Sequence, residues 1–201
     1  MEKYEIRSFG GDAAPKLTEE RTIEGYAAVY NQRSEVLYDF VNNRRFIEVI
    51  EPGAFTEELI QNSDVRALIE HSSGRLLARS RNGKGTLALE IDDYGLKYRF
   101  VAPNTEEGNY AAEMIKRGDI SGSSFAYRSD KPGSVVWEKQ DNNIWLRKVL
   151  RIDKLYDVTI TAYPAYTGTE VTVRSIEELE KPIENINDDY LIEIYKYRKL
   201  I

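Results

Sequence analysis

Apolar and polar residues alternate along much of this 201-residue chain, and the alternation predicts a protein built mainly from β-strands. The clearest hairpin spans residues 87–100, where alternating apolar positions lie on both sides of the turn sequence DDYG. A second hairpin is expected to turn at QDNN, residues 140–143. Further strands are expected at residues 4–9, 23–30, 65–69, 118–128, 154–163 and 169–175.

Two stretches between these strands have helical spacing. A short helix is expected near residues 55–60, and a longer one over residues 104–118, capped by Asn104 or Thr105 and ended by Gly118. Residues 34–50 are apolar but irregular and are expected to form an extended loop that leads into a short strand, and residues 70–83 are expected to form a polar loop. Strands do not alternate with helices, so a doubly wound fold is disfavoured. The pattern predicts a mainly β protein with some α: a closed antiparallel β-barrel of about seven strands with helices packed outside.

The composition changes near residue 176, where Glu, Lys, Asn and Asp become frequent. Residues 187–201 then have the spacing of an amphipathic helix that a finished barrel does not need. The expected organisation is therefore a β-barrel domain over residues 1–175, followed by a charged linker and a C-terminal helix over residues 176–201.

Composition removes several kinds of chemistry. The chain has no cysteine, which excludes disulfides and thiolate metal sites. It has one histidine, so the other ligands of a metal ion would have to be carboxylates. No phosphate-binding glycine motif is present, so neither a metal nor a cofactor is expected. A net charge of −6 argues against a general nucleic-acid binder. The N-terminus has no apolar signal region and no run is long enough to span a membrane, so a soluble, unexported protein is expected.

One predicted strand contains an unusual centre, GSSFAYR, where a core would favour Val or Ile. Alternation puts Phe125 and Tyr127 on one face together with Ser123, and puts Ser124 on the other face between Gly122 and Ala126. Small neighbours leave room for a substrate backbone beside Ser124. A serine on a solvent-facing strand would look the same, and the G-x-S-x-G elbow of α/β-hydrolases is not matched because residue 126 is Ala.

Two further residues complete a candidate set. His71 is the only histidine and follows a predicted strand, although a histidine beside a surface turn is the commoner case. Asp157 is a carboxylate inside an otherwise apolar strand, although it could simply face solvent. A serine nucleophile needs a base to take its proton, and the base needs a third group to orient it. Ser124, His71 and Asp157 have the chemistry for these roles, but their spacing does not prove that they meet.

Five stretches in this order resemble the prohead maturation proteases of tailed phages, which are similar to herpesvirus assemblin. They are IEGYAAVYN, FIEVIEPGAF, VRALIEHSSGRLLARSRNGKGTLALEIDDYGL, APNTEEGNYAAEMIKRGDISGSSFAYR and LYDVTITAYPAYTGTEVTVR. The resemblance implies a serine endopeptidase on an assemblin-like closed barrel. It assigns the base to His71 and the nucleophile to Ser124, with Ser123 as a near neighbour.

The chain departs from assemblin at two points. Assemblin uses a second histidine as the third member, whereas Asp157 stands at the similar place here. Assemblin also has paired arginines that help to bind the oxyanion, whereas this chain has YPAYTGT. The backbone N–H of Ala165 is therefore the expected oxyanion donor, since Pro164 has none.

The resemblance implies cleavage of phage scaffold and major capsid precursors, and of the chain itself, inside a portal-containing prohead in the host bacterial cytoplasm. Self-association is a further expected contact, whereas a membrane or a specific nucleic acid is not. The alternative is a non-enzymatic barrel of the same fold that binds capsid or scaffold proteins. The distance between His71 and Ser124 discriminates between the two, because only the protease needs them within hydrogen-bond reach.

Overall fold

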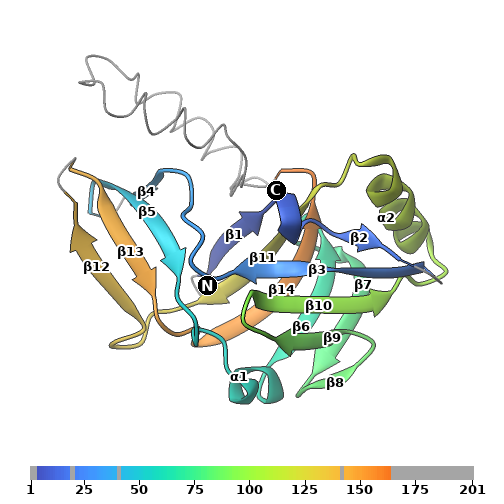
Figure 1. Cartoon of the computed structure of the whole chain (residues 1–201). Helices are drawn as coiled ribbons and strands as arrows, with labels where there is room; N and C mark the ends of the chain where they lie inside the picture. The colour runs from blue at the N-terminus through green and yellow to red at the C-terminus, as the bar shows by residue number, and fades with distance from the viewer. Residues whose placement is uncertain (1–3, 19–20, 40–41, 141–142, 164–201) are drawn as a thin grey trace. The chain divides into compact units, whose positions relative to one another are not determined.

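The computed structural model describes residues 4–18, 21–39, 42–140 and 143–163, which form three open β-sheets and few helices (Figure 1). The largest sheet has six strands in the order β1-β11-β14-β6-β7-β8. Their bounds are Glu5–Phe9 for β1, Gly122–Arg128 for β11, Lys154–Thr161 for β14, Asp64–Ile69 for β6, Ser72–Arg81 for β7 and Lys84–Gly85 for β8. All neighbours are antiparallel except β14 and β6, which are parallel.

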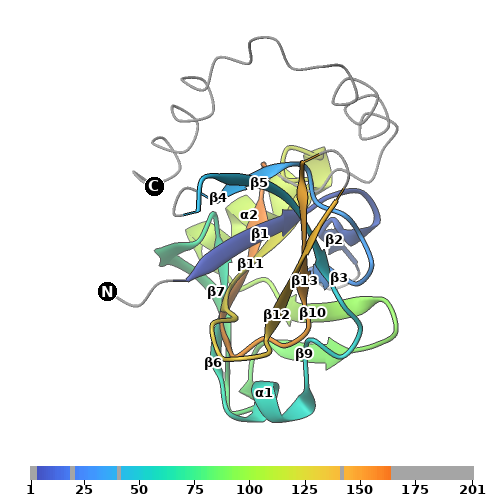
Figure 2. The ribbon, with the colours of Figure 1, turned by 90° about the vertical axis from the view of Figure 1, so that its left-hand side faces the viewer.

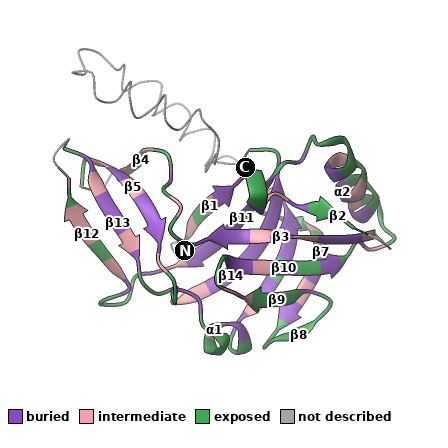
Figure 3. Cartoon of the chain, viewed as in Figure 1, coloured by how far each residue is buried: buried purple, intermediate pink, exposed green. Residues whose placement is uncertain are grey.

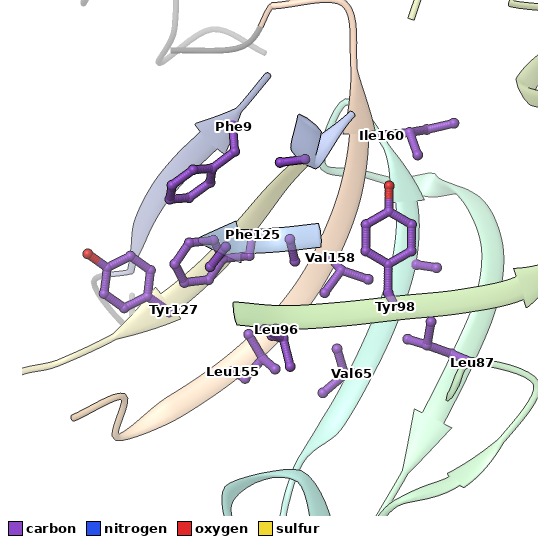
Figure 4. Close-up of a cluster of buried hydrophobic side chains, with 14 of the residues drawn as sticks. Phe9, Val65, Leu87, Leu96, Tyr98, Phe125, Tyr127, Leu155, Val158 and Ile160 are labelled. Carbon is purple, nitrogen blue, oxygen red and sulfur yellow. The ribbon is translucent and has the colours of Figure 1, made fainter. Parts of the chain in front are cut away.

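The second sheet packs on the first and closes the core between them. Its order is β2-β3-β10-β9, with bounds Lys16–Leu17, Thr22–Val29, Gly95–Val101 and Ala88–Ile91. Side chains from both sheets meet in Figure 4, where Tyr98 and Leu96 of β10 lie near Phe125, Val158 and Leu155. β11 and β14 are buried over most of their length (Figure 3). The site described below is therefore carried by the most deeply buried strands.

The third sheet has the order β12-β13-β5-β4, with bounds Val135–Lys139, Trp145–Val149, Arg44–Ile50 and Leu37–Asp39. Its central pair, β13 and β5, is parallel. This sheet lies at the left in Figure 1 and faces the viewer in Figure 2.

The prediction of a closed antiparallel barrel is wrong. The six-stranded sheet ends at β1 and β8, and no pairing within the described residues joins these two edges. Alternation reports which face of a strand is buried but not which strand lies beside it, so the separate third sheet could not be foreseen. The expected polar loop at residues 70–83 is mostly β7, whereas the strand expected at the end of residues 34–50 is present as the seven-residue β5.

Three helical elements lie in the connections between strands of the described residues. Gly11–Ala13 forms a 3-10 turn, α1 spans Glu57–Gln61, and α2 spans Glu106–Arg117. The Thr105 hydroxyl caps α2 by accepting from the Gly108 N–H, and Gly118 ends it with a φ of 82°. α2 packs against β2 and β7. Both helices thus form where capping residues and apolar spacing predict them.

A buried carboxylate joins the third sheet to the edge strand β1. Glu48 of β5 is fully buried and accepts from Arg7 of β1 at 2.7 and 2.9 Å, from Arg147 of β13, and from the Tyr127 hydroxyl at 3.1 Å. Burial alone would raise the pKa of the Glu48 carboxyl, but the two guanidinium groups outweigh it and lower the pKa to about 2. Glu5 completes the charge balance by accepting from both arginines.

No helix among the described residues has the length and apolar character needed to cross a membrane. The division expected at residue 176 lies outside the described residues and stays a prediction.

Glu48→Gln should destabilise the fold by about 3–5 kcal/mol, because it removes the buried charge that pairs with the buried Arg147 and the partly buried Arg7 and leaves them paired with Glu5. The lowered pKa means that the carboxylate's contribution is complete above its ordinary pKa of 4.5 and is lost as pH falls toward about 2. The stability difference between wild type and variant should therefore narrow over that window. Urea unfolding at several pH values measures it.

Glu138→Gln is the matched control, because Glu138 forms a partly exposed ion pair with Lys148 at 2.7 Å. This substitution should have a much smaller effect on stability than Glu48→Gln, because solvent screens the Glu138–Lys148 pair. Equal effects of the two substitutions would contradict the role of Glu48 in holding β1 to the third sheet.

Candidate active site

Three neighbouring elements of the six-stranded sheet carry the candidate side chains. β11 carries Ser124, β14 carries Asp157, and the turn between β6 and β7 carries His71. β14 lies between β11 and β6, and its register aligns Thr159 with Ser124 and Asp157 with Ala126. Side chains aligned in register project from the same face of a sheet. Ser124 and Asp157 therefore share a face, and the turn after β6 reaches over it.

His71 bridges the other two residues. Its Nδ1 lies 2.7 Å from Asp157 Oδ1 and its Nε2 lies 2.7 Å from Ser124 Oγ. Asp157 Oδ1 also accepts from the Thr159 hydroxyl at 3.1 Å. An ionised carboxylate can only accept, so Nδ1 carries the hydrogen of the neutral ring and Nε2 presents a lone pair to Ser124. The arrangement has the geometry of a nucleophile, a base and an orienting acid.

The Ser124 hydroxyl has two further polar neighbours, both from β1. Ser8 Oγ donates to Ser124 Oγ at 2.9 Å, and the Arg7 carbonyl oxygen lies 2.8 Å away. Ser124 has one hydroxyl hydrogen, so His71 Nε2 and the Arg7 carbonyl are alternative acceptors for it. A serine becomes nucleophilic when its hydroxyl hydrogen is transferred to a base such as His71. Ser8 donates its own hydrogen to Ser124 Oγ, so it does not compete for the hydrogen of Ser124.

Ser124 is more enclosed than the sequence predicts. Gly122 and Ala126 flank it as expected, yet the residue has no exposed surface. The edge strand β1 pairs with β11 and aligns Ser8 with Ser124, which strand alternation alone could not reveal. In this arrangement β1 therefore covers the Ser124 hydroxyl.

Ser123 faces the other way, into the core. Its hydroxyl lies 2.8 Å from the Tyr98 hydroxyl and donates to the Ala13 carbonyl at 2.9 Å. Burial raises the pKa of Tyr98, so this phenol stays neutral as a hydrogen-bond partner. The alternation of β11 thus separates the two serines, and only Ser124 reaches His71.

Sequence reasoning missed three residues at this site. Ser8 contacts Ser124, Thr159 contacts Asp157, and Glu70 precedes His71 with its carboxylate 2.7 Å from the Thr161 hydroxyl. Small hydroxyl residues on the same face as Ser124 and Asp157 were the available signal, but it needs the register of β1 and β14. Ala165, the expected oxyanion donor, lies outside the described residues. The described residues contain no group of three or more His, Asp or Glu side chains that could hold a metal ion.

A comparison with known families agrees with this geometry. The family model described as caudovirus prohead serine protease matches residues 5–182 of the 201-residue chain. The chain therefore belongs to this family and is a serine endopeptidase of the phage prohead protease class. No curated protein and no solved structure gave a match.

Asp157→Asn should lower the turnover number strongly, because an amide can favour the wrong imidazole tautomer and does not stabilise the imidazolium. In a serine protease triad the same change costs roughly 10⁴-fold. Asp119→Asn, at an exposed ion pair with Arg117, is the control and should leave turnover unchanged. Timed cleavage of a precursor protein by both variants measures the effect, and unchanged turnover in Asp157→Asn would move the orienting role elsewhere.

Proposed function

We propose that Ser124 is the nucleophile of this prohead protease, that His71 is its general base and then its general acid, and that Asp157 orients His71. The observation that carries the proposal is the pair of 2.7 Å contacts that His71 makes with Asp157 and Ser124. The family match supports it independently, because serine proteases need a nucleophilic hydroxyl with a base beside it.

The reaction follows from these atoms. His71 Nε2 takes the hydroxyl proton while Ser124 Oγ attacks the carbonyl carbon of the scissile peptide. The tetrahedral intermediate collapses when the imidazolium gives its proton to the leaving amine, and an acyl-enzyme remains on Ser124. Water then repeats the sequence with His71 as base and releases the new carboxyl end. Asp157 stabilises the imidazolium in both halves.

The oxyanion of each intermediate needs a donor. We assign it to the backbone N–H of Ala165, which comes four residues after the end of β14. β14 carries Asp157, and Ala165 follows this strand closely in the sequence. Pro164 cannot serve, because it has no N–H.

The substrates assigned to this enzyme are phage scaffold and major capsid precursors, and the chain itself. The family description, a prohead serine protease of tailed phages, supports this assignment. The site of action is then the interior of the assembling, portal-containing prohead within the host bacterial cytoplasm.

Ser124→Ala should abolish cleavage of the scaffold and capsid precursors of the encoding phage, with a loss of several orders of magnitude. Ser123→Ala should retain much of the activity, because its hydroxyl faces Tyr98 and Ala13 in the core. It should instead lower stability by about 1–3 kcal/mol, since it leaves buried partners unsatisfied. Co-expression of enzyme and precursors, followed on gels over time, gives the rates.

Circular dichroism of both serine variants is the control for folding. An active Ser124→Ala together with an inactive Ser123→Ala would show that the nucleophile is Ser123, on the opposite face of β11, and would contradict the proposal. Full activity in both would show that the chain does not use this strand for catalysis.

A further inference from the structure

The turn that carries His71 has an unfavourable backbone. Ile69 pairs with Ser72 across two residues, Glu70 and His71, whose φ angles are 51° and 54°. A two-residue hairpin with both φ angles positive is the pattern of a type I′ turn, which favours Asn-Gly, Asp-Gly or Gly-Gly. Residues with a Cβ atom disfavour this conformation unless, like Asn or Asp, their side chain can form a hydrogen bond with the nearby backbone. Glu-His is therefore a costly sequence for the turn.

The next hairpin of the same sheet provides an internal comparison. Arg81 pairs with Lys84 across Asn82 and Gly83, whose φ angles are 53° and 73°. This turn has the favoured Asn-Gly sequence at the same backbone geometry. The fold can thus make such a turn without strain, and the strained sequence occurs where His71 is needed.

Glu70 has contacts that hold the strained turn in place. Its N–H donates to the Ile160 carbonyl at 3.2 Å, continuing the parallel pairing of β6 with β14. Its carboxylate accepts from the Thr161 hydroxyl and from the Ala162 N–H, each at 2.7 Å. The Thr161 hydroxyl in turn accepts from the Tyr163 N–H at 3.0 Å. One carboxylate therefore fastens the turn to the last residues of β14.

We propose that Glu70 is a positioning residue that fixes His71 for proton transfer with Ser124. This rests on the roles proposed above for His71, Ser124 and Asp157. β6 and β14 are parallel neighbours, so the turn after β6 and the end of β14 lie at the same edge of the sheet. His71 must reach Asp157 on β14 and Ser124 on β11 from that turn. The carboxylate of Glu70 sets the turn's place over β14, and so sets the reach of the imidazole.

The same carboxylate also fixes the backbone where the chain leaves β14. Thr161, Ala162 and Tyr163 each make a hydrogen bond within this cluster. Glu70 thereby ties the turn that carries His71 to the backbone at the end of β14.

Glu70→Asn separates the tether from the backbone strain. Asn is favoured at a positive φ, so the turn itself should be no less stable, but the shorter side chain cannot reach Thr161 and Ala162 together. The purified full chain is treated with a fluorophosphonate, and the inactivation rate is measured over a range of probe concentrations. The maximal inactivation rate constant should fall about 10- to 100-fold, because a displaced base misaligns the attack, with the half-saturating concentration almost unchanged.

Glu70→Gln is the conservative rescue. Its amide oxygen can accept from the Ala162 N–H and its amide nitrogen can donate to the Thr161 hydroxyl, so the maximal rate should stay within about threefold of wild type. Thr161→Val removes the other partner with little change of shape and should give a smaller loss than Glu70→Asn. It also tests the tether if Glu70→Asn fails to fold.

Asn82→Glu is the matched control, because it puts the costly residue into the second turn, away from His71. It should lower the melting temperature and leave the maximal rate unchanged. The positioning role would be overturned if folded Glu70→Asn is inactivated at the wild-type rate. If Glu70→Asn does not fold, a wild-type rate in Thr161→Val would overturn it instead. So would a Glu70→Gln rate as low as that of Glu70→Asn, since the charge would then be what matters. If the fluorophosphonate labels Ser124→Ala and His71→Ala as fast as it labels the wild type, the proposed function itself is overturned, and this inference with it.

Discussion

The pairing of β14 with β11 on one side and with β6 on the other is the constraint on which the site depends. The antiparallel register with β11 puts Asp157 and Ser124 on one face, and the parallel register with β6 delivers the His71 turn to the same region. A shift of either register by one residue would move a required side chain to the opposite face. The apolar residues of the other face, among them Phe125 and Val158, are buried in the core and oppose such a shift. Core packing and site geometry are thus two consequences of the same strand alternation.

The edge strand β1 adds a second set of contacts to Ser124, the proposed nucleophile. Ser8 and the Arg7 carbonyl both contact Ser124 Oγ, while the Arg7 side chain binds the buried Glu48 of the third sheet. The third sheet therefore holds the strand that lies against the nucleophile, although it contributes no side chain to the candidate triad. Because Ser124 is fully buried, the strength of this attachment bears on how easily the site opens.

The sequence predicts the parts of this protein that depend on local chemistry. Alternation places Ser123 and Ser124 on opposite faces of one strand. Thr105 and Gly118 have the residue types that begin and end a helix, and α2 begins and ends at them. The sole histidine had to be the base of any histidine-dependent triad. What the sequence could not supply depends on pairing between distant strands. The open sheets in place of a barrel, the contact of Ser8 with Ser124 and the tether of Glu70 to Thr161 all require a register that alternation does not encode. His71 was expected beside a loop, and only the pairing of Ile69 with Ser72 reveals a tight hairpin.

The central claim is that the hydroxyl of Ser124, and no other, is made nucleophilic by His71. Incubation of the purified chain with a fluorophosphonate, followed by digestion and mass-spectrometric mapping of the labelled peptide, measures this most directly. We expect a single label, on Ser124, that is absent when His71 is replaced by Ala. A label on Ser123 or Ser8, or labelling of Ser124 that persists without His71, would contradict it.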